Sequence, residues 1–60
     1  MVGGYLVEYS EKNGERTEMI CSQKELVKLL QNPYRYSVWL CRYVNVSECM
    51  ANHKGIKLRL

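Results

Sequence analysis

Apolar and polar side chains alternate along two short segments near the start of the chain, residues 5–10 and 15–21. Alternation with a period of two is typical of β-strands that bury one side. The dipeptide Asn13-Gly14 lies between the segments and is a strong signal for a tight hairpin. The pattern therefore predicts a β-hairpin in the first third of the chain.

Two registers of this hairpin compete. A two-residue turn at Asn13-Gly14 pairs Tyr9 with Glu18 and mixes apolar and polar side chains on each side. A three-residue loop, with its glycine in the left-handed region, instead pairs Tyr9 with Thr17 and collects the apolar residues on one side. Register follows the side that is buried, so the second arrangement is predicted. It sets Glu8 opposite Glu18.

Residues 22–31 have the pattern of an amphipathic helix. Ser22 is a good N-cap, and Glu25 three residues later completes a capping box. The leucines that follow form one apolar stripe at helical spacing: Leu26, Leu29 and Leu30. Pro33 ends the helix, because the residue before a proline avoids the helical region.

Residues 34–46 form a long run rich in aromatic and β-branched residues, which predicts a strand. One set of alternating positions is expected on the core side, under the helix: Tyr34, Tyr36, Val38, Leu40, Arg42, Val44 and Val46. The other set is expected to face solvent: Arg35, Ser37, Trp39, Cys41, Tyr43 and Asn45. Thirteen residues exceed the usual strand length, so a bulge or bend is expected near Leu40–Arg42.

The last segment is less clear. Residues 47–54 suit either a short helical turn that begins at Ser47 or a plain loop. Residues 56–60 alternate again, with Lys57 and Arg59 on one side and apolar residues on the other. They are expected to form a final strand that neighbours the 34–46 strand.

The predicted fold is a single α+β domain over residues 1–60. It has two layers in the order ββαββ, a small antiparallel sheet with one helix packed on one face. The other face should then be polar, but it would carry Leu6, Ile20, Trp39 and Tyr43. The sequence thus predicts an uncovered face that is only half polar.

The chain has 60 residues, of which 47% are hydrophobic, and its net charge is +3. That composition excludes disorder. A domain of this size buries only about 60% of its unfolded surface, so disulfides, a metal or a partner chain usually help. No targeting segment or membrane-spanning run is visible, and the three cysteines are odd in number and scattered, so a reduced, cytoplasmic protein is expected.

Cys49 and His53 are the candidate residues for metal binding or catalysis. Their spacing suits one turn of helix, and Cys21 or Cys41 would have to complete a metal site. No C-x2-C pair is present, and Cys21 and Cys41 are expected on opposite faces of the sheet. A Cys–His nucleophile would lack a third, orienting group and a cleft. We therefore predict no enzyme activity, no cofactor and no metal, while the metal question at these four residues stays open.

Basic and aromatic residues interleave on the predicted strand and its neighbour. The candidate partner-binding residues are Trp39, Tyr43, Arg35, Arg42, Lys57 and Arg59. Trp, Tyr and Arg are the types enriched at protein-binding hot spots, and a free strand edge is a common place for pairing with another chain. The same interleaving suits stacking of nucleic-acid bases beside phosphate contacts, although no known nucleic-acid motif is present.

The functional prediction is a small, non-enzymatic accessory protein that acts by protein–protein binding, as a homodimer. Proteins of this kind are often encoded by bacteria or phages and modulate a larger protein. The alternative is a small nucleic-acid-binding module that uses the 34–46 strand.

Overall fold

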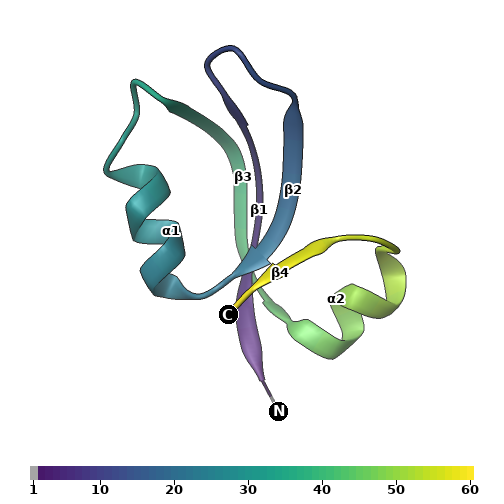
Figure 1. Cartoon of the computed structure of the whole chain (residues 1–60). Coiled ribbons are helices and arrows are strands. Elements are labelled where there is room, and N and C mark those ends of the chain that lie inside the picture. The colour runs from purple at the N-terminus through teal and green to yellow at the C-terminus, as the bar shows by residue number, and fades with distance from the viewer. Residues whose placement is uncertain (1) are drawn as a thin grey trace.

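The fold combines a four-stranded sheet with two short helices in the order ββαβαβ (Figure 1). The structure is a computed structural model that describes residues 2–60, so Met1 of the predicted 1–60 domain lies outside it. The elements are β1 (Gly3–Glu11), β2 (Arg16–Cys21), α1 (Gln23–Leu30), β3 (Tyr36–Asn45), α2 (Val46–Asn52) and β4 (Lys57–Arg59). The α+β class is confirmed, but the predicted ββαββ order lacked the second helix.

The first two strands form the predicted hairpin in the predicted register. Tyr9 pairs with Thr17, and Glu8 lies opposite Glu18. The connection differs from the expected three-residue loop, because the β1–β2 ladder ends at Ser10 and Arg16. The backbone N–H of Gly14 donates to the carbonyl of Glu11 at 3.0 Å, and this glycine does not have a positive φ. The buried face thus set the register, whereas the turn took a longer form.

The sheet is mixed, with the strand order β3-β1-β2-β4. β1 pairs with β2 and β3 in antiparallel fashion, but β4 pairs with β2 in parallel, so the prediction of a purely antiparallel sheet is wrong. The expected neighbourhood of the last strand is also wrong: β4 lies at the far edge, three strands away from β3. α2 connects β3 to β4 at the opposite edge. Parallel strands such as β2 and β4 cannot be joined by a tight turn, and here α1, β3 and α2 lie between them in the chain.

A β-bulge at Trp39 divides β3 into two parts. Leu40 pairs with Glu8 while Val38 pairs with Tyr9, so Trp39 is the extra residue. A bulge was expected near Leu40–Arg42, and it lies one residue earlier. Because side chains alternate with a period of two, one extra residue moves every later side chain to the other face. The single core side predicted for the whole strand is therefore wrong.

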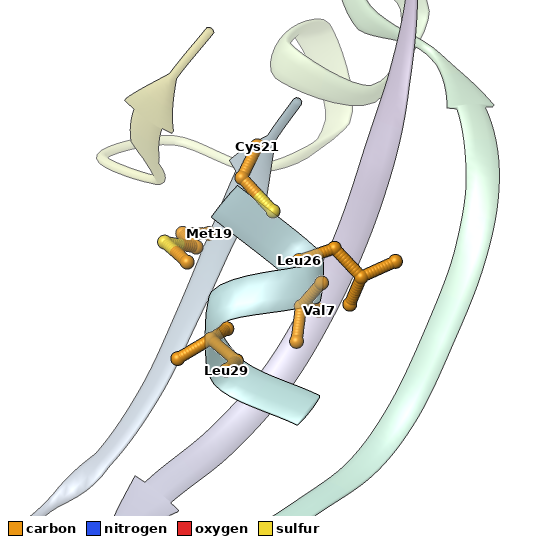
Figure 2. Packing of buried hydrophobic residues seen from close by; sticks show 5 residues of the cluster. All are labelled: Val7, Met19, Cys21, Leu26 and Leu29. Carbon is orange, nitrogen blue, oxygen red and sulfur yellow. The ribbon is translucent and has the colours of Figure 1, made fainter. Parts of the chain in front are cut away.

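Each face of the sheet packs against its own helix, in place of the predicted single covered face. On the α1 face, Leu26 and Leu29 of the helix pack on buried strand residues, which Figure 2 shows as Val7, Met19 and Cys21. On the α2 face, the buried cluster consists of Leu6, Ile20, Val46 and Cys49. Leu6 and Ile20 were expected on an uncovered face, yet they are 2% and 0% exposed. The molecule thus has three layers, with the sheet between α1 on one face and α2 on the other (Figure 1).

Both helices begin at side-chain caps. Ser22 accepts from the backbone N–H of Glu25 at 3.4 Å, as the sequence predicted, while its own N–H donates to the carbonyl of Arg59 in β4. The second helix replaces the helical turn or loop considered for residues 47–54. Its cap is Asn45 rather than Ser47, with Asn45 Oδ1 accepting from the N–H of Glu48 at 3.0 Å.

The ends of the predicted strands are shorter than expected. Tyr34 and Arg35 lie in a turn before β3, and Tyr34 is 85% exposed instead of being part of the core. β4 contains only Lys57–Arg59 of the predicted 56–60. In this segment Ile56 packs beneath α2, but Leu58 and Leu60 remain exposed. Alternation thus correctly predicted burial only for Ile56, where another element covers the strand.

Candidate protein-binding surface

The outer edge of β3 is the longest unpaired strand edge in residues 2–60. β3 has ten residues and pairs only with β1, whereas the opposite edge of the sheet is the three-residue β4. A strand edge presents unpaired N–H and C=O groups that can pair with another chain. The bulge at Trp39 interrupts this edge and leaves a regular run from Leu40 to Asn45.

Trp39 is held in one orientation although half of it is exposed. Its indole Nε1–H donates to Glu8 Oε1 at 3.0 Å, and the Arg16 guanidinium lies 5.5 Å from the ring centroid. Arg16 Nη2 also lies 3.1 Å from the same Glu8 oxygen. We call Trp39, Glu8 and Arg16 the Trp39 cluster. An aromatic ring fixed in this way loses little conformational entropy when a partner covers it.

The Trp39 cluster also changes the acidity of Glu8. The hydrogen bond from Trp39 lowers the pKa of this carboxyl below its ordinary value, and hydrogen bonding with Glu18 and Arg16 acts in the same direction. A hydrogen bond to the charged form of a carboxylate favours that form. Glu8 therefore stays ionised to lower pH than an ordinary glutamate, which keeps the acceptor for Trp39 in place.

Tyr43 lies at the other end of β3, on the α1 face, and is 69% exposed. Its ring contacts Tyr5 edge to face, with the centroids 5.2 Å apart. The Tyr43 hydroxyl lies so close over Gly3 that a Cβ at Gly3 would overlap it, so a larger residue there would require the Tyr43 ring to move. A hollow of about 360 Å³ beside this pair is lined in part by the exposed side chains of Val2 and Leu60.

The four basic residues predicted for partner binding lie in three separate places, and only Lys57 and Arg59 are close to each other. Arg35 lies in the turn before β3, 3.5 Å from Glu11 and over the ring of Tyr36. Arg42 is on the α2 face, at a hollow of about 270 Å³ that Cys49 and His53 also line. Of the predicted set, only Trp39, Tyr43 and Arg42 therefore share the strand β3.

Lys57 and Arg59 are on β4, at the opposite edge of the sheet from Trp39 and Tyr43. They line a hollow of about 320 Å³ between α1 and the sheet, where Arg59 lies 4.0 Å from Glu25. The continuous basic and aromatic strip that the sequence suggested is thus divided between two edges.

The cysteines do not gather into one site. The bulge puts Cys41, which pairs with Val7, on the same face as Cys21, so the expectation of opposite faces is wrong. Cys49 is on the other face, and no group of three or more His, Cys, Asp or Glu side chains in residues 2–60 is arranged to hold a metal ion. Burial raises the pKa of the Cys21 thiol, with the neighbouring Cys41 acting in the same direction.

Cys49 and His53 form a close pair that is poorly arranged for nucleophilic catalysis. His53 Nδ1 lies 3.7 Å from Cys49 Sγ and 2.9 Å from the carbonyl oxygen of the same residue. A carbonyl can only accept a hydrogen bond, so the shorter contact requires the proton on Nδ1. In this arrangement the imidazole nitrogen nearest the thiol donates to the backbone and does not accept the thiol proton.

Sequence reasoning missed the supporting residues Glu8, Arg16 and Gly3. The contacts of Glu8 and Arg16 with Trp39 depend on how β3 folds back onto the hairpin, and Trp39 is 31 positions from Glu8 in the sequence. The Tyr5–Tyr43 pairing likewise follows from the β1–β3 register, which alternation alone does not give.

No protein-family model, curated protein or solved structure matched this chain. Among the described residues, no helix has both the length and the apolar character needed to cross a lipid bilayer.

Proposed function

We propose that this protein is a non-enzymatic interaction protein that binds other protein chains, including a second copy of itself, through the β3 edge and the Trp39 cluster. The observation that carries the proposal is the ten-residue strand β3, which has no strand partner on its outer side among residues 2–60. Unpaired backbone groups along an edge give affinity to any added strand, and neighbouring side chains give specificity.

The side chains along this edge support protein binding. Trp39 and Tyr43 are both large, amphipathic and about half or more exposed, and each is fixed by contacts within the chain. Residues of these types, together with Arg42 between them, are enriched among binding hot spots. A fixed side chain also loses less entropy on association than a mobile one.

The same arrangement gives less support to nucleic-acid binding. Lys57 and Arg59 lie at the far edge of the sheet from Trp39 and Tyr43. The rings that share a hollow with these two basic residues, Tyr9 and Tyr36, are partly buried against the core. Arg16 and Arg35 each lie within 4.0 Å of a glutamate oxygen, which offsets their attraction for phosphate. A single-strand binder needs exposed stacking rings and a basic track side by side, and the exposed rings Trp39 and Tyr43 lie on a different edge from the basic pair of β4.

A comparison of Trp39→Ala with Trp39→Phe tests the role of the ring. We expect Trp39→Ala to weaken self-association by at least about tenfold, because truncation of a hot-spot aromatic typically costs about 2 kcal/mol or more. Trp39→Phe keeps a ring but removes the N–H that binds Glu8, so an intermediate loss is expected. Sedimentation equilibrium measures both, and far-UV circular dichroism reports whether the fold persists.

Two results would count against the role of Trp39. Association of Trp39→Ala as tight as that of the unaltered protein would show that the ring is not an anchor. Loss of the folded circular dichroism spectrum in Trp39→Ala would show that the ring supports the fold instead.

A further inference from the structure

We infer that two copies of the chain pair antiparallel along β3, with the two-fold axis at Tyr43, so that the two sheets join into one. This inference rests on the proposed function and names the partner and the register. It follows from three features of β3: the position of the bulge, the alternation of side chains and the charge of Arg42.

The bulge limits where a second strand can pair. Trp39 is the extra residue, and the paired positions on either side of it belong to different registers relative to β1. A bulge bends its strand and disrupts the regular spacing of hydrogen-bonding groups. The regular part of the edge therefore runs from Leu40 to Asn45, where β3 ends and α2 begins.

Symmetry restricts the register within that run. In an antiparallel pair, residues directly opposite each other lie on the same face of the sheet. A two-fold axis perpendicular to the sheet keeps each face continuous, so the axis must pass through one residue that meets its own copy. An axis between two residues would set opposite faces against each other.

Only two positions of the axis let most residues of the regular run pair with the second copy. An axis at Cys41 meets the bulge after one residue, and an axis at Val44 meets the start of α2 equally soon. An axis at Arg42 pairs residues 40–44, and an axis at Tyr43 pairs residues 41–45. Each of these two centres aligns five residues from each copy.

Charge decides between the two remaining centres. An axis at Arg42 sets two guanidinium groups directly opposite each other, and like charges in that position are destabilising. An axis at Tyr43 sets Arg42 opposite Val44 of the second copy, and Cys41 opposite Asn45. No like-charged residues then face each other within the paired run.

The surroundings of Tyr43 suit a central position. The ring is 69% exposed, and the hollow of about 360 Å³ beside it is lined by Val2, Gly3 and Leu60 among others. A second Tyr43 ring at the axis would lie against the outer side of Tyr43, away from this hollow, and would extend the Tyr5–Tyr43 pair into a row of rings across the joined sheets. Aromatic cross-strand pairs are among the more stabilising side-chain contacts in sheets.

Disulfide crosslinking tests the register directly. In the double variant Cys41→Ser/Tyr43→Cys, the two introduced thiols meet across the axis with Cα atoms about 4.5–5.5 Å apart, a separation that a disulfide spans. Cys21 and Cys49 are buried and should not react in the folded protein. With oxidised glutathione as the oxidant, the two thiols form one disulfide and release two reduced glutathiones. We expect a covalent dimer on non-reducing electrophoresis.

The unaltered protein is the matched control. With the axis at Tyr43, the two Cys41 residues are offset by four positions, about 13 Å along the strands, so Cys41 should not crosslink. Crosslinking through Cys41, or its absence in the Tyr43→Cys variant while the protein still sediments as a dimer, would overturn the register but leave self-association intact. A monomer at every concentration would overturn the self-association in the proposed function as well.

Amide hydrogen exchange gives a second test that needs no substitution. In the unaltered protein, we expect protection of residues 41–45 to increase with protein concentration, while residues 36–38 before the bulge stay unchanged. Exchange that does not depend on concentration in either segment, or concentration-dependent protection along the whole of β3, would contradict pairing at Tyr43.

Discussion

Trp39 is both the bulge residue of β3 and the main aromatic anchor of the proposed binding surface. Its exposure was predicted from alternation, and the structure confirms it as half exposed. Its partners were not predicted, because the hydrogen bond to Glu8 depends on a bulge that shifts the register of two strands. A bulge has no distinct residue type here, so alternation placed it only approximately.

The lowered pKa of Glu8 predicts a dependence of stability on pH. A carboxyl whose pKa is lower in the folded state than in the unfolded state stabilises the fold above the unfolded pKa, which is about 4.3 for glutamate. That contribution is lost as the pH falls through the lower, folded-state pKa. We expect the Glu8→Gln variant to lose less stability than the unaltered protein when the pH is lowered below about 4.

Thermal melting between neutral and acid pH measures this difference. The protein has one tryptophan, so its fluorescence should also report the loss of the Glu8 contact. Glu15→Gln, in the exposed hairpin loop, is the matched control and should follow the unaltered protein. Equal acid sensitivity in Glu8→Gln and the unaltered protein would show that the Trp39 cluster does not hold this carboxylate.

At the scale of elements, periodicity predicted most of the fold where one side of an element is buried. The hairpin register and the helix that begins after Ser22 are confirmed. The second helix was left open, because its seven residues bury only two side chains, Val46 and Cys49, and show little periodicity. The signal that identifies it is Asn45 three residues before Glu48, but Asn45 also fits the end of the long strand.

The cap of α2 can be tested at Asn45. We expect Asn45→Ala to lower the free energy of unfolding by about 1 kcal/mol, a typical cost for the loss of an N-cap side chain. Asn45→Asp keeps an acceptor for the N–H of Glu48 and is the matched control. Chemical denaturation measures both variants. If alanine and aspartate have the same effect, the cap does not stabilise the helix.

At the scale of the whole molecule, the second helix changes the argument for a partner. The sequence suggested an apolar face without cover, but α2 covers Leu6 and Ile20 of that face. The position of β4 could not be predicted either, since alternation gives a strand's sides but not its neighbours. Within the described part of the chain, the longest strand edge without a partner is that of β3, so the case for association rests on backbone groups and on Tyr43 and Trp39.

Net charge separates self-association from binding to nucleic acid. Each copy carries a charge of +3, so two copies repel each other weakly and added salt should screen that repulsion. Binding to phosphates responds in the opposite way, because salt competes with the counterion release that drives it. The effect of salt on any observed assembly therefore identifies the kind of contact.

The most direct test of the central claim is the mass of the unaltered protein by sedimentation equilibrium, over micromolar concentrations and at low and high salt. We expect a concentration-dependent dimer of twice the 7.1 kDa chain that is maintained or strengthened by salt. A species that stays at the monomer mass at every concentration and at both salt levels would contradict association through β3.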